Sequence, residues 1–182
     1  MRFLLSLVFL AGTLCSFAQR DSMMQAFMKT LEEKNKNAIG RPFPRFDVSD
    51  GNKNISNESL HGKVVLINFW FEGCHPCLAE FDALNELYGK LKENRNFEFI
   101  SFTWDDAATI KRVKENFRLQ FKVLKVEAKE CYRLNLQNGF PTSIILDKQG
   151  NIKYLFYGGF PDKEKAREFV MTKLLDSIKR EL

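Results

Sequence analysis

Short apolar runs alternate with amphipathic segments through most of this chain, and the alternation predicts its secondary structure. The apolar runs indicate β-strands, at residues 64–71, 96–103, 120–126, 143–146 and 152–156. Between and after these runs, apolar residues recur every three or four positions, as on one face of a helix. The predicted helices start near His75, after Asp106, near Ala128 and near Asp162. Strands that alternate with helices predict an α/β fold, in which helices flank a central sheet.

Turn residues at both ends of the domain refine this picture. Asp50-Gly51 separates a short strand at Phe46-Asp47-Val48 from another that begins near Ile55, which predicts a small N-terminal β-hairpin. A second turn, at residues 147–151, joins the last two strands as a hairpin. The central sheet is therefore predicted to be mixed rather than purely parallel. Gly158-Gly159 ends the last strand.

The first 18 residues have a different pattern. Arg2 precedes a mostly apolar run, residues 3–14, and the segment ends in Ser16-Phe17-Ala18. This order is typical of a secretory signal peptide, cleaved after about Ala18. An uncleaved anchor is the alternative, although the run is short for a membrane span of about 20 residues. We therefore expect export across the inner membrane to the periplasm or cell envelope of a bacterium.

The sequence predicts three parts in the chain. Residues 1–18 are the predicted signal peptide, residues 19–38 an N-terminal extension or linker, and residues 39–182 one globular domain. The extension carries methionine, phenylalanine and leucine side chains at helical spacing, which predicts a short amphipathic helix. Two interpretations of the extension stay open, a loosely ordered tail and a helix that docks a partner.

The charge of the chain excludes one class of function. The 182 residues carry a formal net charge of +5, and acidic and basic side chains are interleaved along the sequence. Such a modest, dispersed excess is typical of a solvated surface and not of a nucleic-acid-binding stripe. We expect no nucleic-acid partner.

The cysteines carry the main chemical signal. Removal of the signal peptide leaves Cys74, Cys77 and Cys131, and an odd number of thiols cannot form a complete disulfide framework. Cys74 and Cys77 form a C-x-x-C motif where a strand ends and a helix begins. The free N–H groups and positive dipole end of a helix stabilise a thiolate, which is the nucleophilic form of cysteine.

This placement predicts a two-step thiol–disulfide exchange. Cys74, at the start of the helix, attacks a substrate disulfide, and Cys77 then attacks the resulting mixed disulfide. His75 lies in the active-site loop and, when protonated, would stabilise the thiolate of Cys74; an exposed histidine without effect is the alternative. Pro76 shapes the first helical turn, where its missing N–H is not needed.

A metal site is the rival interpretation of the same motif. Zinc requires two further ligands, and only Cys131 and His61 are left to supply cysteine or histidine. The sequence has no second C-x-x-C motif, and a copper site is disfavoured on similar grounds. We expect neither metal nor other cofactor, only a redox-active Cys74–Cys77 disulfide.

Two segments together resemble a known family. Residues 62–80, GKVVLINFWFEGCHPCLAE, and residues 139–152, GFPTSIILDKQGNI, are similar to thioredoxin-fold proteins of the TlpA/ResA group. The resemblance implies a thioredoxin-like fold and protein-disulfide oxidoreductase activity. It implies that Pro141 is a cis-proline opposite the cysteines, and that the backbone of Phe140 pairs with an extended substrate segment. Thr142 belongs to the same substrate-binding segment.

The resemblance also gives Glu80 a role. Three residues after Cys77, it shares the helix face of that cysteine, and in the TlpA/ResA group a glutamate at this spacing acts near the second cysteine. If buried, its carboxyl would have a raised pKa and would exchange a proton with Cys77. An acidic side chain that merely interacts with the helix dipole is the alternative.

Other residues mark departures or secondary predictions. Gly73 stands where thioredoxins usually have tryptophan, and Asn68 where thioredoxin has a buried acid. Trp70 is assigned to substrate binding, with packing behind the active site as the alternative. Cys131 is expected to be a buried thiol.

The predicted function is that of an exported oxidoreductase that reduces disulfides of cell-envelope proteins, with cytochrome c maturation as one pathway. The resemblance implies client proteins with disulfides and a membrane thiol transporter of the DsbD or CcdA type as electron donor. We expect a monomer. A non-catalytic binding module and a peroxiredoxin-like antioxidant are the alternatives. A peroxiredoxin requires threonine three residues before its reactive cysteine, where this chain has Phe71.

Overall fold

The computed structural model describes residues 22–182, and its contacts divide the chain into two compact units. The first unit ends at Asn37 and the second runs from Ala38 to Leu182. The predicted signal peptide lies outside the described residues. The predicted helix of the extension is present, since residues 22–38 are helical. Several of its apolar side chains are exposed, namely Met23, Met24, Phe27 and Met28. Within residues 22–182, no helix has the length and apolar character that a membrane crossing requires.

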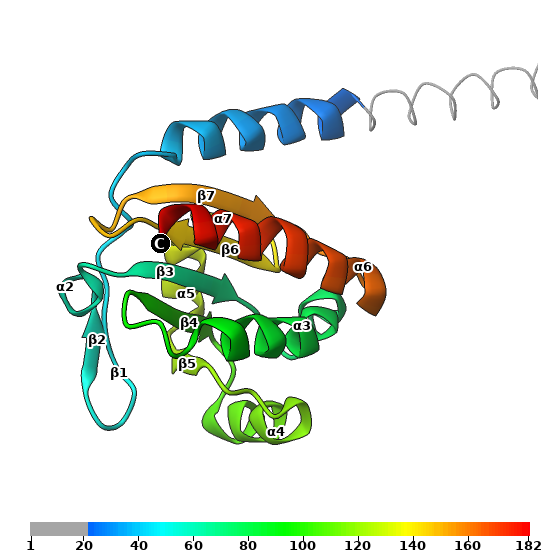
Figure 1. Cartoon of the computed structure of the whole chain (residues 1–182). Helices are drawn as coiled ribbons and strands as arrows, with labels where there is room; N and C mark the ends of the chain where they lie inside the picture. The colour runs from blue at the N-terminus through cyan, green and yellow to red at the C-terminus, as the bar shows by residue number, and fades with distance from the viewer. Residues whose placement is uncertain (1–21) are drawn as a thin grey trace, which may run out of the picture. The chain divides into compact units, whose positions relative to one another are not determined.

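A five-stranded mixed sheet forms the centre of the second unit (Figure 1). Its strand order is β5-β4-β3-β6-β7. The strands are β3 (Val64–Phe69), β4 (Phe97–Thr103), β5 (Lys122–Lys125), β6 (Thr142–Leu146) and β7 (Ile152–Tyr157). The first three are parallel to one another, whereas β6 and β7 run antiparallel to their neighbours. The predicted mixed sheet and the late hairpin are therefore confirmed.

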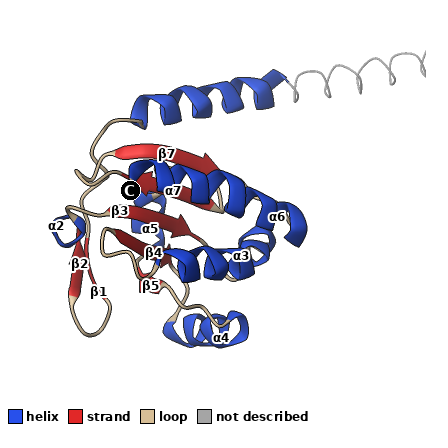
Figure 2. Ribbon diagram, in the orientation of Figure 1, coloured by secondary structure: helices blue, strands red, loops and turns tan. Residues whose placement is uncertain are grey.

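Both faces of this sheet are covered by helices (Figure 2). The helices are α2 (Asn57–Leu60), α3 (His75–Leu91), α4 (Ala107–Phe117), α5 (Ala128–Leu134), α6 (Lys163–Phe169) and α7 (Leu175–Glu181). Successive side chains of a strand point to opposite faces. Accordingly, Val64 and Leu66 of β3 pack with α3, α4 and α7, whereas Val65 and Ile67 pack with α5. The nearly continuous apolar character of the central strand, which Asn68 interrupts, follows from burial on both of its faces.

The small hairpin is also present. It consists of β1 (Asp47–Ser49) and β2 (Asn54–Ser56), which pair antiparallel. Helix α2 was not predicted, because it is a single turn without a helical repeat. It forms where Ser56 and Ser59 cap each other, each side chain accepting a hydrogen bond from the other's backbone N–H.

The predicted terminal helix contains one irregular turn. A π-helical turn, Val170–Leu174, lies between α6 and α7. The core-facing residues of this stretch follow one another at steps of four, at Ala166, Val170, Leu174 and Ile178. Because an α-helix has about 3.6 residues per turn, steps of four drift around its axis. The wider π turn offsets this drift and keeps all four side chains on the core.

Candidate active site

The cysteine pair lies at the strand–helix junction that the sequence predicts. Strand β3 ends at Phe69, and α3 begins at His75 with Cys74 as its N-cap. The backbone N–H of Cys77 donates a hydrogen bond to the Sγ atom of Cys74 over 3.3 Å. Pro76 occupies the first helical turn, where no backbone donor is required. The helix start therefore directs a backbone donor at the sulfur that must carry negative charge.

The two sulfurs form a disulfide of 1.99 Å, with 5.2 Å between the Cα atoms. Cys74 is 5% exposed and Cys77 is 1% exposed. Cys74 is the more accessible of the two, but both residues are nearly covered. His75 is exposed in the same turn. Little of the Cys74 side chain is therefore accessible to a client disulfide in this oxidised form.

Glu80 is the only acidic residue of α3 that is buried within the described part of the chain. It is 1% exposed, and within residues 22–182 its Oε1 atom has no hydrogen-bond partner. Burial raises the pKa of Glu80 to about 8. A carboxyl with such a pKa is mostly protonated at neutral pH and exchanges its proton readily. Being one helical turn from Cys77, it can serve that sulfur as proton donor or acceptor.

The cis-proline segment lies beside the cysteine loop. Thr142 at the start of β6 pairs with Phe69 at the end of β3. The Phe140–Pro141 peptide bond that precedes it is cis, as the resemblance implied. The hydroxyl of Thr142 is buried and donates to the carbonyl of Gly139 over 2.6 Å. Thr142 therefore shapes the loop from within, and its predicted part in substrate binding stays untested.

The carbonyl of Pro141 accepts a hydrogen bond from the N–H of Gly158, with 2.9 Å between nitrogen and oxygen. This bond ties the loop after β7 to the cis-proline segment. The same loop approaches Glu80 through Gly159. The sequence prediction treated Gly158-Gly159 only as the end of a strand, so it missed a part of the site. The paired glycines were the available signal, since glycine often marks a close approach of two backbones.

An aromatic cluster of Phe71, Trp104, Tyr132 and Phe140 lies over the same end of the sheet. Trp104 stacks on Phe71 and on Tyr132, with ring centroids 4.8 Å and 5.4 Å apart. The ring of Phe140 meets all three of the others edge to face. These four side chains are incompletely buried, and Tyr132 is 41% exposed. The cluster thus presents an apolar surface that includes the residue before the cis-proline.

The predicted substrate-binding role of Trp70 is wrong. Its side chain is fully buried, and the indole N–H donates to the hydroxyl of Ser101 over 3.1 Å. Its ring also meets Phe81 of α3 edge to face. Trp70 is the last residue before the cysteine loop and points into the core behind it, so it cannot touch a client. Phe71, the next residue, is only partly buried and joins the aromatic cluster.

Two charged residues fix the loop between β3 and Cys74. The backbone N–H of Glu72 donates to the carboxylate of Asp105 over 2.7 Å. The guanidinium of Arg112 on α4 in turn holds the carboxylate of Glu72 at 2.7 and 2.8 Å. The loop is therefore attached to the residue after β4 and to α4. The sequence patterns did not indicate either of these contacts.

Cys131 takes no part in this arrangement. It lies on α5 in the core cluster of the other sheet face, and it is a free thiol that is fully buried. Burial, together with the charges of Asp105 and Glu130, raises the pKa of Cys131 to about 12. It therefore stays protonated and unreactive, which agrees with the expected buried thiol.

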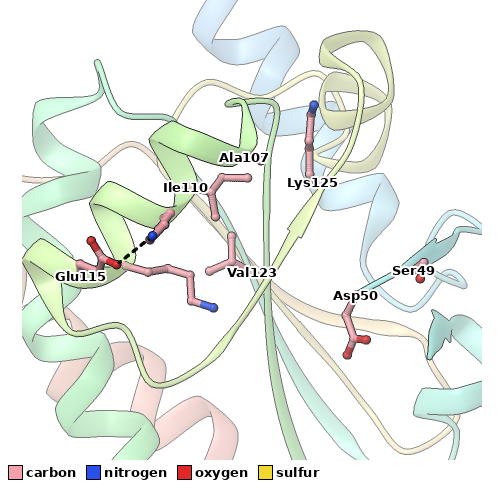
Figure 3. A pocket seen from close by; sticks show the side chains of 9 residues that line it. Ser49, Asp50, Ala107, Ile110, Glu115, Val123 and Lys125 are labelled. Carbon is pink, nitrogen blue, oxygen red and sulfur yellow. Dashed lines mark ion pairs between the residues drawn. The ribbon is translucent and has the colours of Figure 1, made fainter. Parts of the chain in front are cut away.

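The pocket in Figure 3 lies away from the cysteines and has a volume of about 480 Å³. The residues that line it come from the β1–β2 hairpin, α4 and β5, and they include Asp50, Ile110, Val123 and Lys125. None of the predicted site residues lines it. Across residues 22–182, no three His, Cys, Asp or Glu side chains lie together in a way that would hold a metal ion.

Comparison with known proteins agrees with this geometry. The model of the AhpC/TSA family matches residues 39–155. The thiol-disulfide oxidoreductase ResA of Bacillus cereus (strain ZK / E33L) is 34% identical over 122 residues, which is 66% of this chain and 70% of that protein. ResA of Bacillus thuringiensis subsp. konkukian is 34% identical over 143 residues, 78% of this chain and 80% of its own length.

Solved structures show the same similarity. The thioredoxin domain of a thiol-disulfide oxidoreductase from Bacteroides vulgatus has a TM-score of 0.60 and 25% identity. The match covers 73% of this chain and 98% of that domain. The family match spans both the cysteine pair and the cis-proline. The predicted thioredoxin-like fold and the resemblance to ResA are confirmed.

Proposed function

Because this chain belongs to the AhpC/TSA family of thioredoxin-fold proteins and is a thiol-disulfide oxidoreductase of the ResA type, we propose that it reduces disulfides of cell-envelope proteins. The observation that carries the proposal is the Cys74–Cys77 disulfide at the start of α3, one helical turn from a buried glutamate with a raised pKa. This arrangement supplies a nucleophile, a resolving thiol and a proton carrier in one place.

The exchange begins from the reduced pair. The thiolate of Cys74 attacks one sulfur of the client disulfide, and the other client sulfur leaves as a thiolate that takes up a proton. A mixed disulfide then joins Cys74 to the client. The backbone N–H of Cys77, which points at the Cys74 sulfur, stabilises the thiolate before the attack.

The second step needs a thiolate at Cys77. Glu80 in its carboxylate form accepts the proton of the Cys77 thiol, since it lies on the same face of α3. The Cys77 thiolate attacks the Cys74 sulfur, the internal disulfide forms, and the second client sulfur leaves as a thiolate. Two electrons have passed from the cysteine pair to the client, and Glu80 now holds the proton.

Client binding is assigned to the cis-proline segment and the aromatic cluster. An extended client segment pairs with the backbone at Phe140, next to Pro141, and places its disulfide against Cys74. The partly exposed rings of Trp104 and Tyr132 then contact apolar side chains of the client. Such contacts give affinity for an unfolded or extended chain with little dependence on its sequence.

The cellular setting is a further part of the proposal. The predicted signal peptide supports export to the periplasm or cell envelope, with cleavage after about Ala18. In that compartment the oxidised cysteine pair must be reduced again, and a membrane thiol transporter of the DsbD or CcdA type would supply the electrons. The protein is proposed to act as a monomer. Cytochrome c maturation fits, because the haem-binding cysteines of the apoprotein must be reduced first.

The near-complete burial of both sulfurs favours one second candidate, a binding module whose disulfide only locks the fold. In that case the disulfide would resist reduction by any physiological dithiol. A peroxiredoxin-like activity fits the residues less well, since Phe71 replaces the threonine of that chemistry and its ring is stacked on Trp104.

The test uses the reduced protein lacking residues 1–18 and a peptide with one disulfide. The chain with both cysteines should reduce the peptide, Cys74→Ser should be inactive, and Cys77→Ser should accumulate a mixed disulfide visible by mass spectrometry. Cys131→Ser is the matched control and should retain full activity. Turnover by the Cys74→Ser protein would disprove the assignment, and a disulfide that no dithiol reduces would favour the binding module.

A further inference from the structure

Two glycines follow β7, and they are needed for different reasons. Gly158 has φ +75°, a left-handed conformation that side chains rarely adopt, and the space beside it is open. Gly159 has no such backbone conformation, so its lack of a side chain must have another cause. That cause is the space around its Cα atom.

A side chain at position 159 would collide with two residues of the site. A Cβ atom built there would lie 2.6 Å from Cγ and 2.9 Å from Cδ of Pro141, and 2.9 Å from Oε1 of Glu80. Non-bonded carbon atoms prefer about 3.5–4.0 Å. The proline ring is rigid, and the Gly158–Pro141 hydrogen bond holds the two segments together. Only glycine fits between them.

The backbone of Gly159 therefore covers the carboxyl group of Glu80 from one side, and Pro141 lies beside it. No charged side chain contributes to the raised pKa of Glu80, for which burial is the cause. On α3, Cys77 does not titrate while it is in the disulfide, and Asp82 lies at the surface. On α6, Lys163 is paired with Asp82 over 3.0 Å. The loop after β7 reaches this carboxyl group at Gly159.

We propose that Gly159 is a positioning residue for Glu80, whose missing side chain lets the loop after β7 close over the carboxyl group and exclude water from it. A methyl group at position 159 pushes the loop away from the Pro141 ring and admits water. The carboxylate form of Glu80 then gains hydration and forms at lower pH. The consequence for exchange rests on the proposed function, whereas the covering of Glu80 does not.

The test compares Gly159→Ala with Gly89→Ala. Gly89 lies on α3, has open space beside it and no left-handed conformation, so it is a matched control. The titration midpoint of Glu80 is measured in the oxidised proteins by carbon-13 NMR of its carboxyl group. Gly159→Ala should lower the midpoint by at least about one pH unit, a tenfold change in the proton equilibrium, and Gly89→Ala should not change it. An unchanged or higher midpoint in Gly159→Ala overturns the proposal.

The pH profile of peptide reduction separates this inference from the proposed function. If Glu80 accepts the proton of Cys77, the profile of Gly159→Ala shifts to lower pH by the same amount as the NMR midpoint. A shifted midpoint with an unshifted profile supports the positioning of Glu80 by Gly159 and removes Glu80 from the exchange.

A double-mutant cycle keeps the proposal testable if Gly159→Ala folds poorly. Pro141→Ala removes the two ring atoms nearest to the added methyl group. Gly159→Ala should therefore lower the denaturation midpoint less in the Pro141→Ala background than in the natural sequence. Equal losses in both backgrounds would show that the proline ring does not hold Gly159 in place, and would contradict the proposal.

Discussion

The backbone N–H of Glu72 donates a hydrogen bond of 2.7 Å to the carboxylate of Asp105, across 33 positions of sequence. Glu72 is two residues before Cys74, and Asp105 is two residues after the end of β4. The bond therefore attaches the cysteine loop to the adjacent strand. It is charge-assisted and partly buried, which makes it stronger than an exposed contact of the same length.

Asp105→Ala should destabilise the oxidised protein by about 1.5–3 kcal/mol, the usual range for a hydrogen bond to a charged group. It should also slow peptide reduction, because the loop before Cys74 loses its support. Urea denaturation and the exchange rate measure the two effects. Asp47→Ala removes an exposed carboxylate of β1 and should change the stability by less than about 0.5 kcal/mol. Equal stability of the two variants would contradict this account.

Arg112→Ala should lower the stability less than Asp105→Ala does, although its ion pair with Glu72 has two short contacts. Both side chains of this pair are exposed, so water and salt screen their attraction. The loss of stability in Arg112→Ala should disappear in 1 M salt, whereas the loss of stability in Asp105→Ala should persist. Urea denaturation at low and high salt is the measurement. A loss of stability in Arg112→Ala that does not depend on salt would show that the ion pair is shielded from solvent, contrary to this prediction.

Glu80 should make the stability depend on pH in a defined window. Its ordinary pKa of 4.5 applies in the unfolded chain and about 8 applies in the folded one, so between these values the folded state binds more protons. The contribution of Glu80 to the free energy of unfolding is therefore fully present below pH 4.5. It is lost as the pH rises to 8, and the loss is at most about 5 kcal/mol.

Glu80→Gln should abolish this dependence, because an amide does not titrate. The test is to measure the free energy of unfolding of the oxidised natural protein and of oxidised Glu80→Gln at several pH values. As the pH rises, Glu80→Gln should become more stable relative to the natural protein. Glu86→Gln, at an exposed ion pair on the same helix, is the control and should leave the slope unchanged. A pH-independent difference would mean that Glu80 ionises normally.

Trp104→Ala should impair the reduction of a peptide disulfide and spare that of a small disulfide. Trp104 packs against three other rings of the aromatic cluster, and aromatic pairs contribute about 0.5–1.5 kcal/mol each. We expect KM for the peptide to rise about tenfold, since about 1.4 kcal/mol corresponds to that factor. Phe27→Ala, at an exposed ring outside the cluster, should have no effect. An equal loss with both kinds of substrate would argue against client binding by the cluster.

Cys131 should not react in the folded protein. The reduced chain, treated with iodoacetamide at neutral pH, should be labelled at Cys74 and should take up label at Cys131 only after denaturation, because that thiol is buried and its pKa is raised to about 12. Cys131→Ala should keep full activity at a cost of about 1 kcal/mol for the small cavity. Labelling of native Cys131 would show that α5 opens.

Much of the fold could be predicted from the sequence because its signals are local. The apolar run at 64–71, the capping Asp106 and the turn at 147–151 each act within a few residues, and β3, α4 and the β6–β7 hairpin lie where they indicate. The short helix α2 and the π turn at Val170–Leu174 escaped prediction, since one has no helical repeat and the other only adjusts how a helix meets the core.

For the site, the sequence by itself determined the position of Cys74 and Cys77 at a strand–helix junction, because strand periodicity, the cysteine spacing and Pro76 are all local. Only the tertiary structure decided that Trp70 is buried in the core while Phe71 stays partly exposed in the aromatic cluster. It also decided that Asp105 supports the loop and that Gly159 covers Glu80. The physical reason is that burial depends on segments far apart in the chain. The pKa of Glu80 is raised by packing against residues some sixty to eighty positions later, which no local pattern contains.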